Sequence, residues 1–340
     1  MQPQPDRTAQ VALFHSTERT TAIRQAVAAV IAALPWQSYQ RVVIKPNLVM
    51  VDRPYANTHP DTLQTVLGLM RDHYRGPITI AEGAALNATT TAFAAHGYPA
   101  LAQRYGCQLL DLNGDEPVTV TLQDRGEKPM TLRLARTIVE SDCRISLSLP
   151  KTHDTVLVTM ALKNMIMGAL VNRRVADCHT RPYWLDRLGQ IVRGHGNGWG
   201  SDKQAMHKSY PLINLYLAQL APLVWPHLSI LDGFVAMEGA GPIDGDPVPW
   251  GIALAGVDPL AVDVLAAHLM GFRLAEIGYL AYCAQAGRGV ADLATIQVVG
   301  NIAPDAVRRT FIPHPQHQAQ RRWHHPQALR LMRQTPALSI

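Results

Sequence analysis

The sequence predicts an α/β protein with an open, mainly parallel sheet that has helices on both faces, arranged in one lobe or two. Short β-rich runs alternate with helical segments over the first 170 residues, which is typical of parallel strands joined by helices. The alternation resumes after about residue 210. With 340 residues, 47% of them hydrophobic, the chain is long enough to bury a substantial core.

The expected strands are short apolar runs that are rich in β-branched residues. They cover residues 11–15, 41–45, 78–82, 107–112, 144–149, 227–232, 250–255 and 295–299. The expected helices lie between the strands and cover residues 21–34, 60–74, 90–105, 212–225, 259–270 and 274–285. Two further runs, P-V-T-V-T-L and M-T-L-R-L, predict a small hairpin before the strand at residue 144.

A single α/β domain over residues 1–302 is the simplest organisation of this pattern. A Gly-rich loop or lid is expected at about residues 172–210, because five glycines between Gly189 and Gly200 disfavour regular structure. Residues 303–340 form a basic tail rich in Pro, His and Arg, which we expect to be partly helical or loose.

The composition disfavours several classes of partner. The net charge of +5 comes largely from arginines in the tail, and only 6% of residues are aromatic, so nothing indicates binding to nucleic acid. The four cysteines lie far apart and form no iron–sulfur cluster motif. No apolar run reaches the roughly 18 residues that a membrane span needs. We therefore expect no membrane partner and a cytoplasmic protein with reduced thiols.

Polar residues follow five of the expected strands. In open α/β sheets, ligands bind outside the carboxyl ends of the strands, so these residues are candidates for a binding site. They are Lys45, Asn47, Glu82, Lys151, His153, Asp232 and Asp258. If the five strands run parallel, all of these side chains lie at one edge of the sheet.

Lys45 and His153 each have a structural and a functional interpretation. Lys45 follows the apolar run V-V-I, so its ammonium group forms a salt bridge with Glu82 or Asp232, or else contacts a ligand directly. His153 is either satisfied by backbone hydrogen bonds or contacts ligand and transfers protons. Lys151 lies two residues away, and two neighbouring cationic groups favour a carboxylate or phosphate ligand.

The segment from residue 154 to 168 is almost entirely apolar and predicts a buried helix with its N-cap near Asp154. Lys163 and Asn164 lie within this helix and need polar partners, unless Lys163 extends its ammonium group to water. At about 1.5 Å per residue, Lys163 would lie roughly 15 Å from Asp154. We therefore expect Lys163 at the floor of the pocket, away from His153.

Two aspartates belong to the expected helix 259–270. Asp258 precedes Pro259 and is the predicted N-cap of that helix. Asp263 lies among apolar residues without such a role, so we expect it to neutralise Lys163 or Lys45.

A Gly-rich segment lies between residues 230 and 250. Its sequence G-A-G-P-I-D-G is not followed by a helix, which argues against a dinucleotide-binding loop. The glycines predict a wide turn whose backbone approaches either a ligand or a neighbouring segment, or a tight surface turn. Glu238 at this turn is a candidate base, magnesium ligand or turn-capping acid.

Several segments resemble the prokaryotic domain of unknown function 362, whose members are often fused to ferredoxin-type iron–sulfur modules. They are V-V-I-K-P-N-L-V (42–49), T-H-P-D-T-L (58–63), A-E-G-A to A-H-G-Y (81–98), L-P-K-T-H with L-K-N-M-I-M-G (149–168), L-D-G-F-V-A-M-E-G-A-G-P (231–242) and G-V-D-P-L-A-V-D (256–263). The resemblance adds His59 and His207 to the candidate residues. Lysines and histidines at strand ends are also similar to those of nickel-pincer lactate racemases, an analogy at the level of fold.

These observations predict an enzyme that acts on a small anionic molecule, possessing no iron–sulfur module of its own. His153, Lys151 and Glu238 are the candidate catalytic residues. The candidate substrate-binding residues are Lys45, Asn47, His59, Lys163, Asn164 and His207. Structural or metal-binding roles, with a divalent metal as the candidate cofactor, are assigned to Glu82, Asp232, Asp258 and Asp263. The alternative is a non-catalytic protein that binds or delivers a metal or cofactor to redox enzymes, with a ferredoxin-like protein as partner.

Overall fold

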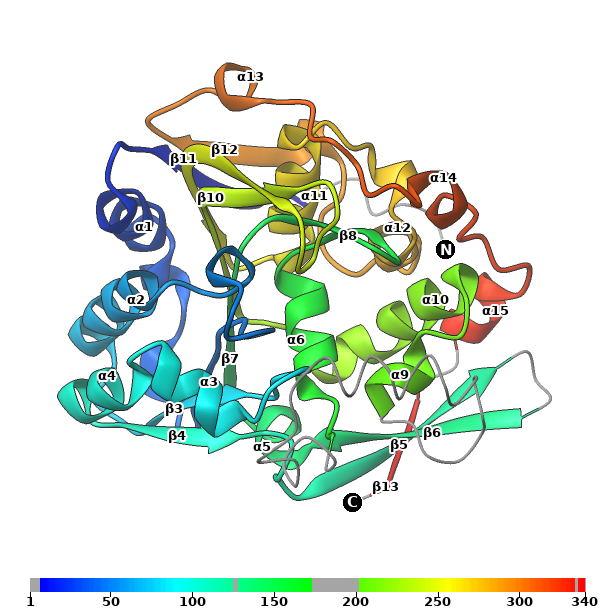
Figure 1. The fold of residues 1–340 in the computed structure, drawn as a ribbon, viewed down its shortest axis with the longest axis horizontal. Coiled ribbons are helices and arrows are strands. Elements are labelled where there is room, and N and C mark those ends of the chain that lie inside the picture. The colour runs from blue at the N-terminus through cyan, green and yellow to red at the C-terminus, as the bar shows by residue number, and fades with distance from the viewer. Residues whose placement is uncertain (1–6, 125–127, 173–201, 334–335, 340) are drawn as a thin grey trace.

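A ten-stranded sheet forms the centre of the computed structural model, which describes residues 7–124, 128–172, 202–333 and 336–339 (Figure 1). Eight of its strands lie side by side in the order β12 (Ile296–Gly300), β1 (Ala9–His15), β11 (Asp246–Gly256), β10 (Leu228–Glu238), β7 (Cys143–Ser148), β2 (Val42–Lys45), β3 (Ile78–Glu82) and β4 (Cys107–Asp111). Each of the eight expected strands is confirmed, with β10 and β11 longer than predicted.

All of these eight strands except β11 run in the same direction. β11 is antiparallel to both of its neighbours, β1 and β10, while the other adjacent pairs are parallel. The fold class predicted from the sequence, an open and mainly parallel α/β sheet, is confirmed. The expectation that Asp258 shares an edge with the other strand-end residues is wrong, because the reversed β11 delivers Asp258 to the opposite edge.

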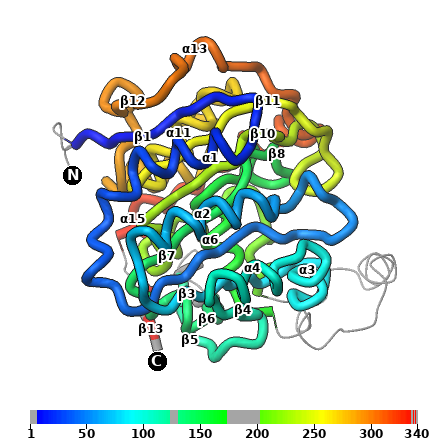
Figure 2. The backbone as a smooth tube through the Cα atoms, turned by 90° about the vertical axis from the view of Figure 1, so that its left-hand side faces the viewer, coloured from blue at the N-terminus to red at the C-terminus, as the bar shows by residue number. Residues whose placement is uncertain are grey.

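Helices cover both faces of the sheet, as predicted (Figure 1). One face packs against α1 (Arg19–Ala28), α2 (Pro60–His73), α3 (Thr89–Ala95) and α4 (Tyr98–Tyr105), and Figure 2 looks onto this side of the molecule. The other face packs against α6 (Ala161–Ala169), α10 (Tyr210–Leu220), α11 (Pro259–Leu269) and α12 (Gly278–Gln285).

Alternate residues of each strand enter the two cores. Val42 and Ile44 pack into the core beneath α1 and α2, whereas Val43 between them packs into the core on the opposite face. This two-sided burial explains why the strands are continuous apolar runs instead of alternating with polar residues. None of the described helices is both long and apolar enough to cross a bilayer.

The segment after β7 differs from the prediction. Residues 151–159 form a hairpin of β8 (Lys151–His153) and β9 (Leu157–Thr159), and α6 begins only at Ala161. The run T-V-L-V-T is rich in β-branched residues, which favour a strand over a helix. The N-cap expected near Asp154 is therefore wrong, and the chain turns back on itself before the helix starts.

The expected hairpin before residue 144 is confirmed as β5 (Pro117–Asp124) and β6 (Lys128–Ala135), followed by α5 (Arg136–Val139). These strands form a separate three-stranded sheet with β13 (Ala337–Ser339) from the end of the chain. The loop or lid predicted at residues 172–210 lies largely outside the described residues. The described chain resumes at residue 202 with α9 (Asp202–Met206).

The described residues after position 302 pack against the body of the protein. This part of the chain contains α13 (Pro304–Val307), α14 (His317–Gln320), α15 (Ala328–Met332) and β13. Phe311, Trp323 and Leu331 are buried in the same core as α10–α12. The ring centroid of Phe311 lies 4.9 Å from that of Trp250 in β11, and the indole N–H of Trp250 donates to the Val307 carbonyl at 2.7 Å. The described part of the tail thus completes the core instead of hanging loose.

We predict that Phe311→Ala lowers the free energy of unfolding by about 3–5 kcal/mol, because it removes a buried aromatic ring and leaves a cavity. The control is Ile312→Ala at the next position, where the side chain is 60% exposed and the change should stay within about 0.5 kcal/mol. Urea denaturation of the full chain measures both. Equal losses for the two variants would contradict the packing described for the tail.

Candidate active site

A pocket of about 220 Å³ lies beyond the carboxyl ends of β2, β3 and β7. We call it the lysine pocket, because four buried lysines line it. Its lining includes the side chains of Lys45, Asn47, Glu82, Lys151, His153, Asp154, Lys163, Asn164, Lys203 and His207. It lies at the sheet edge where ligands bind in open α/β folds.

A buried ion pair joins the ends of β2 and β3. The Lys45 ammonium nitrogen lies 3.0 and 3.1 Å from the two carboxylate oxygens of Glu82, and both side chains are almost fully buried. The same ammonium donates to Asn164 Oδ1 in α6 at 2.8 Å. Burial lowers the pKa of Lys45, and the Glu82 carboxylate opposes that shift. The predicted Lys45–Glu82 salt bridge is confirmed, whereas Asp232 instead pairs with Arg19.

Gly168 provides the space through which Lys45 reaches this ion pair. A Cβ atom at Gly168 would lie 1.5 Å from Lys45 Cε and 2.8 Å from Lys45 Cδ. These distances are far inside van der Waals contact, so any larger residue would displace the lysine. The glycine in the motif L-K-N-M-I-M-G therefore allows Lys45 to cross α6 at close range.

Lys151 is buried, and no carboxylate of the described residues accepts a hydrogen bond from its ammonium group. Its ammonium nitrogen donates to Asn47 Oδ1 at 2.7 Å and to the carbonyl oxygen of Ala56 at 2.8 Å. Burial, followed by the positive charge of Lys163, lowers the pKa of Lys151 to about 7. At neutral pH this amine therefore exists in both the charged and the uncharged form.

The β8–β9 hairpin brings Lys163 next to His153. The Lys163 nitrogen lies 2.8 Å from His153 Nε2, and Asp154 Oδ1 lies 2.9 Å from His153 Nδ1. The separation of roughly 15 Å expected from a continuous helix is therefore wrong, because the chain folds back before α6 begins. Asp154, His153 and Lys163 form one row of side chains, although Lys163 was expected at a distance from the other two.

This row has two proton arrangements. When Nδ1 of His153 holds the proton, it donates to Asp154, and Nε2 accepts a hydrogen bond from the charged Lys163. When Nε2 holds the proton, it donates to an uncharged Lys163 amine, and Nδ1 accepts from the backbone N–H of Thr155 at 3.0 Å. Each arrangement leaves the imidazole neutral but changes the charge on Lys163.

The pKa values favour such an exchange near neutral pH. Burial and then the nearby Lys163 charge lower the pKa of His153 to about 3, so its imidazole stays neutral. Burial lowers the pKa of Lys163 to about 8, with Asp154 opposing the shift. Lys163, not His153, is thus the member of the row that gains or loses a proton near physiological pH.

Lys203 in α9 is a pocket residue that sequence reasoning missed. Its ammonium nitrogen donates to the Gly83 carbonyl oxygen at the end of β3, and burial lowers its pKa to about 8. Four residues later on the same helical face, His207 lines the pocket and its Nδ1 lies 2.6 Å from the Lys203 carbonyl oxygen. The pattern that could have indicated both residues is the spacing K-x-x-x-H, which places the two side chains on one helical face directly after the Gly-rich segment.

Asp263 has a different partner from the one expected. Its two carboxylate oxygens accept hydrogen bonds of 2.9 Å from the backbone N–H groups of Ala161 and Leu162, the first turn of α6. The prediction that it neutralises Lys163 or Lys45 is therefore wrong, because unpaired N–H groups at a helix start compete for a buried carboxylate. Burial raises the pKa of Asp263 to about 7. Asp258 caps α11, as predicted.

Three other candidate residues lie outside the pocket lining. Glu238 accepts a hydrogen bond of 2.9 Å from the backbone N–H of Ile312, a contact to the C-terminal segment and not to the Gly-rich turn. His59 caps the start of α2, and Asp232 joins α1 to α2 through Arg19 and Thr62. The remaining candidates, Asn47, Asn164 and His207 among them, do line the pocket.

The Gly-rich turn between β10 and β11 closes one side of the pocket, where Pro242 and Ile243 contribute to the lining. A Cβ atom at Gly241 would lie 2.2 Å from the Thr152 carbonyl oxygen in β8. The turn therefore needs glycine for close approach to the strand that holds Lys151 and His153. Of the interpretations left open by the sequence, approach to a neighbouring segment is the one observed.

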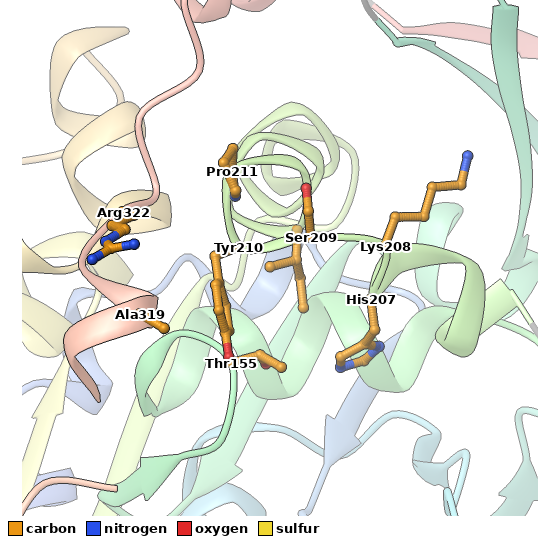
Figure 3. Close-up of a pocket in the computed structure, with 9 residues that line it drawn as sticks. Thr155, His207, Lys208, Ser209, Tyr210, Pro211, Ala319 and Arg322 are labelled. Atoms are coloured by element: carbon orange, nitrogen blue, oxygen red, sulfur yellow. The ribbon is translucent and has the colours of Figure 1, made fainter. Parts of the chain in front are cut away.

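A larger cavity of about 510 Å³ adjoins the lysine pocket, and His207 lines both (Figure 3). Thr155, Tyr210 and Arg322 contribute to its wall, with Lys208 pointing away from Thr155. Within the described residues, no group of three or more His, Cys, Asp or Glu side chains is arranged to hold a metal ion.

Comparison with known proteins shows a match to the domain of unknown function DUF362 over residues 42–268, which include all residues that line the lysine pocket. A thylakoid-associated protein from Synechocystis sp. is 25% identical over 292 residues, or 85% of this chain and 77% of that protein. The lactate racemase apoprotein from Thermoanaerobacterium thermosaccharolyticum aligns with 76% of this chain at 14% identity and a TM-score of 0.44. The alignment spans 57% of the racemase chain.

We predict that Gly168→Ala lowers the free energy of unfolding by about 1–3 kcal/mol, because the added methyl group displaces Lys45 from Glu82. The control is Gly68→Ala in α2, where the nearest atom would lie at an ordinary 3.7 Å. That change should leave stability unaltered or raise it by up to about 1 kcal/mol, since alanine favours helix. Urea denaturation compares the two, and similar effects would contradict the close contact at Gly168.

We also predict that the unliganded protein becomes more stable as pH rises from about 7 to about 8.5. Lys151, Lys163 and Lys203 titrate at about 7, 8 and 8 in the folded chain, against 10.5 ordinarily. The unfolded chain therefore binds more protons in this window, and proton loss favours the folded state. At higher pH, the raised pKa values of buried thiols act in the opposite direction.

Chemical denaturation at several pH values measures this slope. Lys151→Met should make it shallower, whereas Lys208→Met removes an exposed lysine outside the lysine pocket and should leave it unchanged. An identical slope in wild type and Lys151→Met would contradict the lowered pKa of Lys151.

Proposed function

Starting from the fact that the chain belongs to the DUF362 family, we propose that it is an enzyme acting on a small molecule that bears a carboxylate or phosphate group. The observation that supports this most strongly is the excess of buried positive charge in the lysine pocket. Four lysines line it, all of them at least 93% inaccessible to solvent, and among the described residues Glu82 is the one lining carboxylate buried to the same degree.

An anionic ligand would compensate this excess charge. Lys45 is already paired with Glu82, and Asp154 reaches Lys163 only through His153. Within the described residues, Lys151 and Lys203 donate their hydrogen bonds to neutral oxygens. Buried charges without a counterion are costly, so the pocket gains free energy when a carboxylate or phosphate enters it. The volume of about 220 Å³ suits a small organic acid.

We assign proton transfer to Lys163, with His153 and Asp154 holding its amine in position. A group with a pKa of about 8 works as acid or base near neutral pH, whereas the pKa of about 3 makes His153 a neutral hydrogen-bonding partner. Lys203 and Asn47 are the proposed contacts to the anion. In this assignment Glu238 has no part in the reaction, because it lies outside the pocket lining and holds the backbone of Ile312.

We predict that small carboxylates and phosphate stabilise the protein and that Lys203→Met weakens their binding about tenfold or more, the effect of losing one charge-assisted hydrogen bond. Calorimetric titration with pyruvate, lactate, malonate and inorganic phosphate measures the affinities, and lactamide serves as the uncharged comparison. The control, Lys208→Met, removes the same charge outside the lysine pocket and should bind as the wild type does.

The proposal fails if none of the four anions binds more tightly than lactamide. If Lys203→Met binds as tightly as the wild type, Lys203 is not a contact to the anion. A small molecule that copurifies with the protein in stoichiometric amount, without turnover of any acid, would favour a cofactor-delivery protein over an enzyme.

A further inference from the structure

The chain uses lysine in an unusual way. It contains 25 arginines but only six lysines, and four of the six lie in the lysine pocket. Arginine binds carboxylate and phosphate through two parallel hydrogen bonds and keeps its charge at any ordinary pH. A pocket that needed positive charge alone could use arginine, which is far more common than lysine in the rest of this chain. The amines therefore point to chemistry in which a nitrogen loses its proton.

Lys151 has the surroundings of such an amine. An uncharged amine has two N–H groups and one lone pair, and the two acceptors among the described residues, Asn47 Oδ1 and the Ala56 carbonyl, match those two N–H groups. The side chain is 1% exposed and lines the pocket. Its uncharged form is thus fully hydrogen-bonded, with the lone pair left unused.

Building on the anion pocket proposed above, we propose that Lys151 is a nucleophile that forms an imine with the carbonyl group of a 2-oxo acid. Lys151 supplies the attacking nitrogen, and Lys203 and Asn47 contact the carboxylate of the substrate. This names the substrate class within the small anions: acids with a carbonyl next to the carboxylate.

The chemical step uses groups already in the pocket. The Lys151 lone pair forms a bond to the carbonyl carbon while the C=O π electrons move to oxygen, and a proton passes from nitrogen to that oxygen. The charged Lys163 then protonates the hydroxyl group, which leaves as water as the nitrogen lone pair forms the C=N bond. The products are a protonated imine, water and an uncharged Lys163 amine, which accepts a hydrogen bond from His153 Nε2.

The proton balance of the pocket agrees with this step. Lys151 has the lower pKa, about 7, and Lys163 has a pKa of about 8, so the state with Lys151 uncharged and Lys163 charged is populated at neutral pH. Burial and a neighbouring cation are the two features that activate lysine as a nucleophile. The protonated imine withdraws electrons from the adjacent carbon, and the uncharged Lys163 is then placed to remove a proton there.

Reductive trapping tests the proposal. The full chain is incubated with pyruvate and sodium cyanoborohydride at neutral pH, and its intact mass and chymotryptic peptides are measured. We expect one reduced adduct per chain, located on Lys151. Lactate, which has no carbonyl group, should give no adduct and should slow trapping by competing for the pocket. Lys208→Arg is the matched control outside the lysine pocket and should be trapped as the wild type is.

Lys151→Arg should lose the adduct while phosphate still raises its melting temperature, since arginine keeps the positive charge. An adduct on Lys163 or spread over several lysines overturns the assignment to Lys151. Absence of an adduct, with pyruvate and lactate both raising the melting temperature of the wild type, overturns the imine and leaves the anion pocket standing. If neither acid stabilises the protein and no adduct forms, the proposed function fails as well.

Discussion

The buried ion pair between Lys45 and Glu82 is the contact on which the arrangement of the pocket depends. It joins the ends of two neighbouring strands, and Asn164 extends it to α6. The Glu82 carboxylate also accepts hydrogen bonds from the backbone N–H groups of Leu48 and Gly83, so it fixes the loops that follow β2 and β3. Removing either charge would leave the other buried without a counterion. The free-energy cost of that unpaired charge is far larger than the net stabilisation that the pair provides. The remaining lysines are placed relative to this fixed point.

The strand-end residues were predictable because parallel strands deliver their carboxyl ends to one edge of a sheet. Lys45, Glu82, Lys151 and His153 meet there as expected, each directly after or within a short strand. The eight strands of the main row were also predictable, because burial on both faces makes them continuous apolar runs. Asp258 was misplaced because nothing local to residues 246–256 reveals that this strand runs against its neighbours.

Other features depend on contacts that one segment of sequence does not contain. The position of Lys163 follows from the β8–β9 hairpin, where Leu157 adopts a positive φ of 64° that no local pattern indicates. The partner of Asp263 could not be read from charge, because the competing acceptor sites were backbone N–H groups of a helix whose start had been misplaced. Lys203 joins the pocket from a helix more than a hundred residues away from the strand end that it contacts. Pairing opposite charges therefore does not predict the partner of a buried carboxylate when backbone N–H groups also need hydrogen-bond acceptors.

The position of β1 in the sheet has a consequence for how the chain is made. This first strand is flanked by β11 and β12, which are formed by residues 246–256 and 296–300. One edge of β1 therefore lacks its partner until residues 246–256 have been synthesised and the other until residues 296–300 have been, although β2, β3 and β7 can pair much earlier. During that interval the apolar residues of β1 and α1 lack part of the core against which they pack in the folded protein. Segments with exposed apolar residues and unpaired strand edges are the kind that chaperones bind during synthesis.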